Sequence, residues 1–413
     1  MKILHYVPRT DLRDGGVPRF VLDIARVLSA HGHCSTILAD DTTDTPASWL
    51  VDDTRPSEPP HDHRLPRVIS LGKPGIADHF FTPEAMDRVR EELSQADVLH
   101  LHCLWATTCM QLAAQARDMG VPYIISLHGM LDDWSMAQRY LKKRVYLSLG
   151  GRYFLEKAWR IHCTATAEAE QARRWLPMGS TVVIPYLIDL ELYRELPGPD
   201  AAHARFPFLN EDKPTILFLS RLHYKKNPEA LLEAAAMLAR SGHDFNLAIA
   251  GTGESEYVDS LRRKAESLNI AKRTHFVGHV GGVEKTSLYQ ACDLFVLPTS
   301  QENLGLVLIE SMACGTLVVT TKGVDIWRDI QGSGGAAIVE PTAEGLCGEL
   351  ASLLQQPRIL DRMGQKARTW ALRQFDEHRL IARFEELYGQ AAARTATLRM
   401  TRLEPPGDLR ASA

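Results

Sequence analysis

Short, uninterrupted apolar runs alternate along the chain with segments in which apolar residues recur every three or four positions. The second pattern predicts a helix from about residue 17 to residue 29, with Val17, Phe20, Val21, Ile24 and Leu28 on one face. The runs in the first half of the chain predict β-strands at 2–7, 35–39, 68–71, 98–104, 123–127, 160–164 and 181–185. Apolar strands that alternate with helices are typical of a parallel sheet covered on both faces.

The same alternation resumes in the second half of the chain, after a segment rich in proline and glycine. Its runs predict strands at 215–219, 246–250, 274–277, 294–297, 317–320 and 337–339. We therefore expect two tandem α/β domains, at 1–195 and 214–376, joined by a linker at 196–213. A helical pattern at 377–394 and a flexible tail at 395–413 follow, and residues 41–66 are expected to form a long surface loop.

The composition narrows the class of protein without indicating a function. Of 413 residues, 45% are hydrophobic and 24% are charged, which is ordinary for a globular protein and excludes a disordered or disulfide-scaffold chain. The net charge of −4 provides no basic field that would attract nucleic acid. The seven cysteines form no C-x-x-C pair, and no apolar run suits a transmembrane helix or a signal peptide, so we expect a cytoplasmic protein.

The most informative segment holds two glutamates eight positions apart, Glu302 and Glu310. Glu302 follows the strand at 294–297, Gly305 opens a helix, and Glu310 lies inside that helix, roughly 12 Å from Glu302 at helical spacing. A helix start presents free N–H groups that suit a diphosphate, and carboxylates on either side of it can accept hydrogen bonds from a sugar and a ribose. Without further context the alternative is that neither glutamate binds a ligand: Glu302 would be a carboxylate near a helix N-terminus, and Glu310 a solvated residue of the helix.

A basic loop follows the strand at 215–219 and contains Arg221, Lys225 and Lys226. The carboxyl ends of strands are where open α/β sheets bind ligands. An arginine can bind a diphosphate through a bidentate fork and a lysine can do so as a point charge. The alternative is an exposed basic loop with no ligand.

The first half of the chain offers weaker signals. Gly15 and Gly16 precede a helix start and allow a ligand to approach the backbone, although the segment is not a dinucleotide fingerprint and also fits a plain turn. His128 follows the strand at 123–127, where a histidine is more often structural. His100 and His102 share one face of a strand, but no further ligand stands at a known metal-binding spacing, so a structural role is favoured and no metal is expected.

The segment QENLGLVLIESMACGTLVV, which begins at Gln301, resembles the E-x₇-E region of the retaining GT-B glycosyltransferases of family 4, the glycosyl transferases group 1. This resemblance implies a GT-B fold, in which two facing Rossmann-like domains have a cleft between them. It also implies transfer of a hexose from a nucleotide-diphosphate sugar to a hydroxyl of a glycan or lipid-linked glycan, with retention, in polysaccharide or glycoconjugate biosynthesis. The first domain would then be on the acceptor side, the second would bind the nucleotide sugar, and the helix at 377–394 would cross back to the first.

The resemblance also assigns roles to individual residues. The catalytic residues would be His128 and Glu302. The donor-binding residues would be Gly15, Gly16, Arg221, Lys226, Gly251, Asn303, Leu304, Gly305 and Glu310. Asn227 stands where the family usually has glycine, so Lys225 remains an alternative to Lys226.

The chain contains no Asp-x-Asp triplet, which metal-dependent GT-A glycosyltransferases use to hold a divalent ion. We therefore expect no metal and no cofactor besides the donor substrate, with Arg221, Lys226 and a helix start stabilising the leaving diphosphate. Two alternatives stay open: a GT-B-fold sugar-nucleotide epimerase that acts on the donor alone, and a non-catalytic two-lobed sugar-binding protein.

One stretch, 138–161, is both basic and amphipathic. Its basic residues are Arg139, Lys142, Lys143, Arg144, Arg152, Lys157 and Arg160, with Glu156 as the one acidic residue. Interleaved leucines and tyrosines would let such a face lie on an anionic membrane, and a peripheral position on the inner face of the membrane stays open. The alternative is a solvated helix that covers the core of the first domain.

Overall fold

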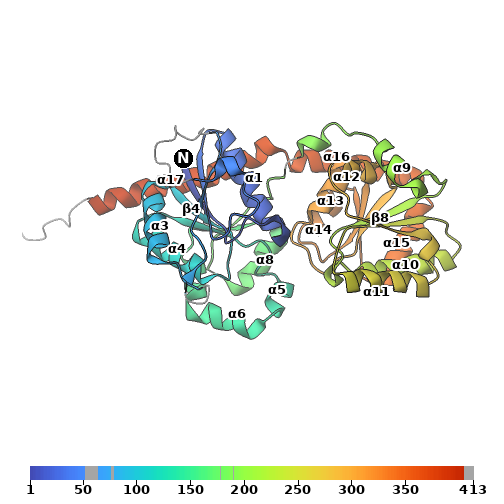
Figure 1. Ribbon diagram of the computed structural model, residues 1–413, viewed down its shortest axis with the longest axis horizontal. Coiled ribbons are helices and arrows are strands. Elements are labelled where there is room, and N and C mark those ends of the chain that lie inside the picture. The colour runs from blue at the N-terminus through green and yellow to red at the C-terminus, as the bar shows by residue number, and fades with distance from the viewer. Residues whose placement is uncertain (52–63, 76–78, 177, 189, 404–413) are drawn as a thin grey trace, which may run out of the picture. The chain divides into compact units, whose positions relative to one another are not determined.

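A computed structural model describes residues 1–51, 64–75, 79–176, 178–188 and 190–403 (Figure 1). The chain divides into two compact units, one formed by residues 1–188 and the C-terminal segment from Glu377, the other by residues 189–376. Each unit is an α/β structure built on one parallel sheet. No helix within the described residues combines the length and the apolar character needed to cross a membrane.

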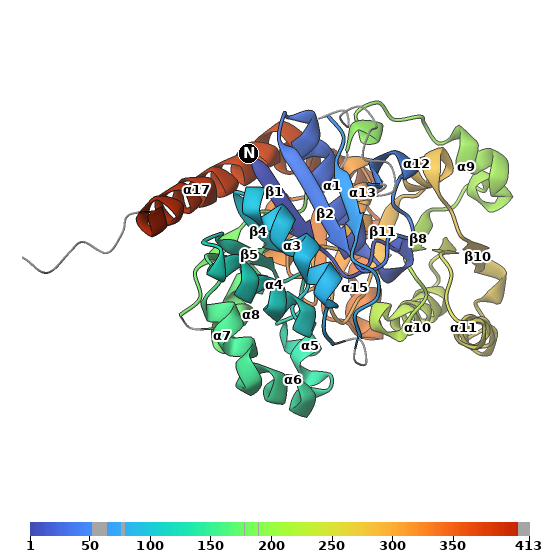
Figure 2. The same cartoon turned by 60° about the vertical axis from the view of Figure 1, so that its left-hand side comes forward.

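The first unit contains a seven-stranded sheet in the order β3-β2-β1-β4-β5-β6-β7. Its strands are β1 (Lys2–Tyr6), β2 (Cys34–Ala39), β3 (Arg67–Ser70), β4 (Val98–Leu101), β5 (Tyr123–Ser126), β6 (Arg160–Cys163) and β7 (Thr181–Val183). Its helices are η1 (Leu12–Asp14), α1 (Gly16–Ala30), η2 (Ala47–Trp49), α3 (Pro83–Gln95), α4 (Thr107–Asp118), α5 (Asp133–Ala137), α6 (Tyr140–Tyr146), η3 (Leu147–Gly151), α7 (Arg152–Glu156), α8 (Thr166–Trp175) and α17 (Glu377–Leu403). The last helix, α17, packs against β4 (Figure 2).

The second unit contains a six-stranded sheet in the order β10-β9-β8-β11-β12-β13. Its strands are β8 (Thr215–Leu219), β9 (Asn246–Ala250), β10 (Thr274–Gly278), β11 (Leu294–Leu297), β12 (Leu317–Thr321) and β13 (Ala336–Val339). Its helices are η4 (Glu191–Tyr193), α9 (Asp200–Arg205), η5 (Pro207–Asn210), η6 (Tyr224–Lys226), α10 (Pro228–Arg240), α11 (Ser255–Ser267), η7 (Ala271–Arg273), α12 (Gly282–Ala291), α13 (Leu306–Ala313), α14 (Trp327–Gly332), α15 (Ala343–Leu354) and α16 (Pro357–Gln374). The central strands are buried along their whole length, as their uninterrupted apolar runs predict.

In each sheet the strand order reverses beside the first strand of the unit. In the first unit β1 lies between β2 and β4, and in the second unit β8 lies between β9 and β11. The loops that leave the two strands on either side of such a reversal run in opposite directions and leave a crevice at the carboxyl ends of the strands. Ligands of open α/β sheets bind at this switch point, so the β1/β4 and β8/β11 positions are where sites are expected.

The structure differs from the sequence-based expectation at the linker. The first unit ends at residue 188 rather than 195, and the expected linker 196–213 contains α9 and η5. The main chain of this segment bonds to α12, since Ala202 N–H donates to Ser287 Oγ at 2.9 Å and Gly198 N–H donates to Gln290 Oε1 at 3.1 Å. Of the prolines in this segment, Pro207 is the first residue of η5, where a missing N–H costs little, and Pro199 is the N-cap of α9.

The C-terminal segment also differs from the expected flexible tail. Residues 395–403 continue α17 as helix, and residues 404–413 lie outside the described part of the chain. Thr395 Oγ1 donates to the Asp97 carbonyl, and the Arg399 guanidinium donates to the Ala96 and Ser94 carbonyls at 3.0 Å each. These contacts fix the helix on the first unit beyond the predicted end at 394. Of the expected surface loop 41–66, residues 52–63 lie outside the described residues.

Candidate active site

Glu302 lies in the loop after β11, at the switch point of the second unit. Its main chain is fixed on both sides: Glu302 N–H donates to the Gly323 carbonyl at 2.8 Å, and Asp325 N–H donates to the Glu302 carbonyl at 2.9 Å. Gly305 precedes α13 with a φ of 69°, and a Cβ atom there would lie 2.7 Å from Leu308 Cδ1 and 3.1 Å from Glu302 Cγ. Glycine at this position therefore leaves room for the Glu302 side chain.

Lys226 brings a second predicted residue to the same place. It ends η6 in the loop after β8, and its Nζ contacts Glu302 Oε2. Only 12% of the Lys226 side chain and 22% of the Glu302 side chain are exposed. The structure thus joins two residues that are 76 positions apart in the sequence, 226 and 302. Of the two candidate lysines, Lys226 is the one that contacts Glu302, whereas Lys225 uses its carbonyl oxygen to accept from Ser300 N–H.

The electrostatics of this loop suit an anion. Burial lowers the pKa of Lys226 to about 7, and the neighbouring charges of Lys225 and Arg221 act in the same direction. The Glu302 carboxylate opposes this effect because it favours the charged ammonium. A bound diphosphate would add negative charge beside three cations, so it would restore the full charge of Lys226.

The backbone conformation explains the residue type at two positions, one in the loop after β8 and one in the loop after β9. Asn227 has a φ of 55°, in the left-handed region, and its side-chain amide donates to the Pro341 carbonyl at 3.1 Å. Asparagine tolerates this conformation better than most residues, which accounts for its presence where the family usually has glycine. Gly251 has a φ of 129°, and a Cβ atom there would overlap the carbonyl oxygen of Ser220, so the loops after β8 and β9 approach closely.

The remaining predicted donor residues of the second unit lie around α13. Glu310 accepts from Lys285 Nζ at 2.7 Å and from the Tyr289 hydroxyl at 3.3 Å, both on α12, and its side chain is 16% exposed. Asn303 Nδ2 donates to Asp325 Oδ2 at 3.1 Å, and the Leu304 side chain is buried. Asn303 and Leu304 therefore shape the loop, and α13 begins without a side-chain cap for its first N–H groups.

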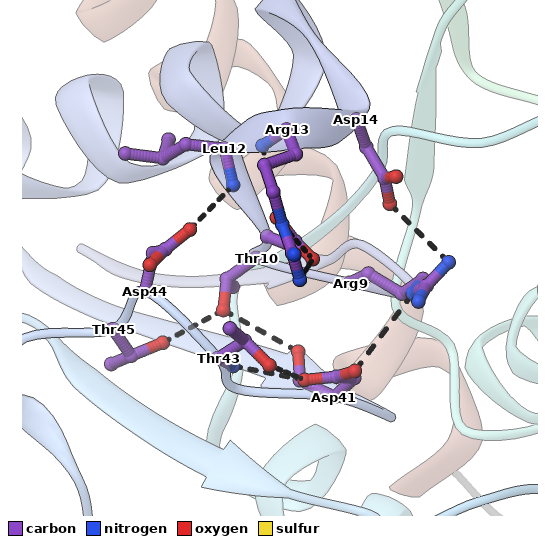
Figure 3. Close-up of polar contacts among 10 residues, drawn as sticks. Arg9, Thr10, Leu12, Arg13, Asp14, Asp41, Thr43, Asp44 and Thr45 are labelled. Carbon is purple, nitrogen blue, oxygen red and sulfur yellow. Dashed lines mark hydrogen bonds and ion pairs between the residues drawn. The ribbon is translucent and has the colours of Figure 1, made fainter.

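A polar loop, residues 9–14, precedes the Gly15–Gly16 turn of the first unit. Figure 3 shows the contacts of this loop with residues 41–45. Leu12 N–H donates to Asp44 Oδ2 at 2.8 Å, and the Thr10 and Thr45 hydroxyls lie 2.9 Å apart. The Arg9 guanidinium lies 3.6 Å from Asp14 and 3.8 Å from Asp41. Gly15 has a φ of 111°, which favours glycine, and α1 starts at Gly16 without a side-chain cap. The N–H groups of Leu12, Arg13 and Gly15 are bonded within this loop, so the N–H groups that suit a ligand at the switch point between β1 and β4 are those of the first turn of α1.

His128 lies two residues after the end of β5 in a strained conformation, with a φ of 50°. Its Nδ1 is 2.6 Å from the Tyr186 hydroxyl and its Nε2 is 3.3 Å from His102 Nδ1. Burial, with a smaller contribution from His162, lowers the pKa of His128 well below the usual histidine value, so the ring is neutral. Each ring nitrogen therefore has a partner within the first unit.

Three buried histidines could in principle hold a metal ion, since ligand atoms of His5, His100 and His102 lie within 4.8 Å of one another. Their nitrogens are mostly in use already. His100 contacts the Tyr388 hydroxyl and Ser126 Oγ at 2.7 Å each, and His102 contacts His128 and His5. Of the ring nitrogens of these three histidines, all of them in the described part of the chain, only His5 Nε2 lacks a hydrogen-bond partner, so these residues fit a hydrogen-bonded layer beneath α17 better than a metal centre.

Asp40 is a candidate that the sequence patterns did not reveal. It follows β2 directly, and the Tyr6 hydroxyl donates to its two carboxylate oxygens at 3.0 and 3.2 Å. Burial raises the pKa of Asp40 to about 7. The sequence did contain a signal, because an aspartate at the carboxyl end of a strand lies where ligands bind. This signal is weak, because the acidic run from Asp40 onward also resembles an ordinary surface loop.

Two Rossmann-like units with candidate ligand residues at their switch points define a nucleotide-binding α/β enzyme fold of the GT-B type. The family model "Glycosyl transferases group 1" matches residues 201–370, and the model "Glycosyl transferase 4-like domain" matches residues 15–186. Together they span most of the chain, which belongs to family 4 of the GT-B glycosyltransferases and is a glycosyltransferase.

Curated relatives agree with this assignment, and a solved structure shares the fold. The chain is 29% identical over 370 residues to the phosphatidyl-myo-inositol mannosyltransferase of Mycolicibacterium smegmatis, covering 86% of this chain and 84% of that protein. It is 25% identical over 397 residues to a glycogen synthase of Mycobacterium tuberculosis, covering 91% of each. The structure of Anabaena HepE in complex with UDP matches with a TM-score of 0.73 at 19% identity, over 94% of this chain and all of that one.

Proposed function

We propose that the protein transfers a hexose from a nucleotide-diphosphate sugar to a hydroxyl of a glycan or lipid-linked glycan, with retention at the anomeric carbon and without a metal ion. The observation that carries the proposal is the contact between Lys226 and Glu302 at the switch point of the second unit. It pairs a cation suited to a diphosphate with a carboxylate suited to sugar hydroxyls. Polysaccharide or glycoconjugate biosynthesis is the setting that such an activity serves.

Four residues of the second unit have a specific role in this proposal. Arg221 and Lys226 bind the diphosphate, Glu302 accepts hydrogen bonds from the sugar, and Glu310 accepts them from the ribose. The bond between the anomeric carbon and the diphosphate oxygen breaks as the bond to the acceptor oxygen forms on the same face. The acceptor proton moves to the departing diphosphate oxygen. The protein then contributes positioning and charge stabilisation, with the two cations and the start of α13 in the place of a metal.

The comparisons suggest which substrates to examine first. One relative is named a GDP-mannose-dependent mannosyltransferase acting on a phosphatidylinositol monomannoside, and another is named a glycogen synthase. HepE has been solved with UDP-glucose. A lipid-linked acceptor with GDP-mannose and a glycan acceptor with UDP-glucose are therefore the two leading pairs.

The test is a transfer assay with the full chain in the presence of EDTA. GDP-mannose with phosphatidylinositol vesicles and UDP-glucose with glycogen serve as the probes, and NMR gives the anomeric configuration of the product. We expect transfer from at least one donor to give an α-linked product, because both donors carry an α-linked sugar. A β-linked product would contradict retention, and activity lost with EDTA but regained with Mg²⁺ or Mn²⁺ would contradict the metal-free site.

We further propose that the basic surface of residues 138–161 meets an anionic membrane that carries the acceptor. Leu141 and Leu149 are each 77% exposed on α6 and η3, and Tyr140, Val145 and Tyr153 in the same stretch are exposed as well, so large apolar side chains are concentrated here. Arg144, Arg152 and Arg174 line a pocket of about 250 Å³ together with Leu147 and Ser148, and arginines suit lipid phosphates. Lys143 is excluded from this surface, because its ammonium donates to Ser135 Oγ at 3.0 Å.

Co-sedimentation with lipid vesicles tests the membrane surface. We expect the wild type to bind vesicles that contain anionic lipid and to be released by salt, since exposed charges are screened beyond about 10 Å at 0.1 M. A Leu141→Ser, Leu149→Ser variant and a Lys142→Ala, Arg144→Ala variant should each lose binding. Leu192→Ser is the matched control, because Leu192 is 75% exposed on the second unit. Failure of the wild type to bind anionic vesicles at low salt would favour a water-soluble acceptor.

A further inference from the structure

The switch point of the first unit contains a carboxylate whose role is unassigned. Asp40 follows β2 at the carboxyl edge of the sheet, and its N–H donates to the Pro8 carbonyl at 3.0 Å, which fixes it beside the end of β1. Tyr6, the last residue of β1, donates to its carboxylate, and Thr108, in the first turn of α4, contacts the Tyr6 hydroxyl in turn. Three different elements therefore converge on this half-buried carboxylate.

Asp40 has no cation to balance it within the described structure. The titratable groups that face it are Tyr6 on β1, Cys103 in the loop after β4, and Cys109 on α4. The nearby Arg9 pairs instead with Asp14 and Asp41 (Figure 3). A half-buried carboxylate without a cation is costly, so its presence at a ligand-binding edge indicates a functional role.

The hydrogen bonds from Tyr6 use only part of the acceptor capacity of the Asp40 carboxylate. The Tyr6 hydroxyl lies 3.0 Å from Asp40 Oδ2 and 2.9 Å from Thr108 Oγ1. An ionised carboxylate only accepts, so Tyr6 donates to Asp40, and Thr108 in turn donates to Tyr6. Two carboxylate oxygens offer about four acceptor positions, and Tyr6 supplies one proton to them. The remaining positions suit hydroxyl donors.

We propose that Asp40 binds hydroxyl groups of the sugar acceptor at the switch point of the first unit, with Tyr6 as its positioning residue. This inference rests on the proposed function, because it names where the acceptor of that reaction is held. The ligand class is a polyol with two neighbouring hydroxyls, which can donate to the two oxygens of one carboxylate. A carboxylate paired in this way fixes the orientation of the acceptor.

The inference predicts a specific pH dependence. Because the pKa of Asp40 is raised to about 7, the carboxyl is protonated below this pH and ionised above it. The ionised form accepts from two hydroxyls through stronger, charge-assisted bonds, so the acceptor KM should fall as the pH rises through about 7. The Tyr6 hydroxyl favours the ionised form, so Tyr6→Phe should move this midpoint to higher pH.

Steady-state kinetics with the pair of substrates that the transfer assay identifies form the first test. Asp40→Asn should raise the acceptor KM by about 10-fold, lower kcat much less, and remove the pH dependence of KM. Asp87→Asn is the matched control, since Asp87 is an exposed aspartate on α3 paired with Arg90. An acceptor KM in Asp40→Asn equal to that of the wild type across the pH range would overturn the inference.

Ligand-detected NMR separates this inference from the proposed function. The probes are methyl α-mannoside, methyl α-glucoside and myo-inositol, added to the full chain without a donor. We expect saturable binding of at least one probe at pH 8, weaker binding at pH 6, and loss of binding in Asp40→Asn but not in Asp87→Asn. Binding without any transfer activity would remove the proposed function alone. The absence of binding by all three probes, or binding that Asp40→Asn retains, would overturn the role of Asp40.

Discussion

Replacing Glu302 with alanine is expected to lower kcat by about 100-fold or more, in line with the loss of a transition-state contact. The side chain lies at the switch point of the second unit, and its main chain is fixed by bonds to Gly323 and Asp325. Alanine leaves this backbone in place, so the variant should fold and bind a nucleoside diphosphate. It removes the carboxylate that holds the sugar while charge develops at the anomeric carbon. Steady-state kinetics of transfer with the wild type and the variant measure the effect.

Two further variants make the Glu302 result specific. Glu310→Gln should raise the donor KM more than it lowers kcat, because Glu310 contacts Lys285 and Tyr289 beside α13 rather than the reacting end of the site. Glu340→Ala is the control for loss of a carboxylate, since Glu340 is 70% exposed beside Lys322. Wild-type turnover in Glu302→Ala would remove Glu302 from the catalytic site.

The largest effect is expected from the double variant Arg221→Ala, Lys226→Ala. Hydrogen bonds to charged groups contribute about 1.5–3 kcal/mol each, so loss of both corresponds to about 10²–10⁴-fold in kcat/KM. These cations are proposed to neutralise the leaving diphosphate, and the chain offers no Asp-x-Asp triplet to replace them. Calorimetric titration with UDP and GDP, together with transfer kinetics, measures the loss. Transfer by the double variant at the wild-type rate would contradict the proposed diphosphate site.

The pH dependence of nucleotide binding provides an internal check on the same loop. Burial lowers the pKa of Lys226 to about 7, while the contact with Glu302 favours the charged form, so the free protein loses this charge as the pH rises past neutrality. Binding of a diphosphate above pH 7 then requires uptake of a proton, so the affinity should fall by up to about tenfold per pH unit. Lys226→Ala should remove this dependence. Lys225→Ala should move its midpoint upward, because Lys225 is one cause of the lowered pKa.

Much of the fold was predictable because it depends on local patterns. The buried strands β8, β9 and β11 are short apolar runs in the sequence, and their bounds in the structure are those that the runs predict. The contact between Lys226 and Glu302 was also foreseeable in outline. Both residues follow strands that flank the β8/β11 switch point, so parallel topology brings their loops together.

The features that sequence reasoning missed depend on tertiary contacts. Asp40 is unusual only because Tyr6 and α4 bury it, and neither is adjacent in the sequence. The extension of α17 to residue 403 depends on contacts of Thr395 and Arg399 with the carbonyls after α3. The segment 196–213 resembles a linker in sequence because it is rich in proline. The contacts that order it are with α12, and the local sequence pattern does not predict them. In each case the deciding partner lies far away along the chain.

The most direct test of the central claim is a crystal structure of the full chain grown with GDP-mannose or UDP-glucose in the presence of EDTA. The account predicts the diphosphate within hydrogen-bonding distance of Lys226 Nζ and the Arg221 guanidinium, with a sugar hydroxyl on the Glu302 carboxylate. Lys226 and Glu302, which contact each other in the structure described above, would then each contact the donor. A diphosphate bound away from the loops after β8 and β11 would contradict the account.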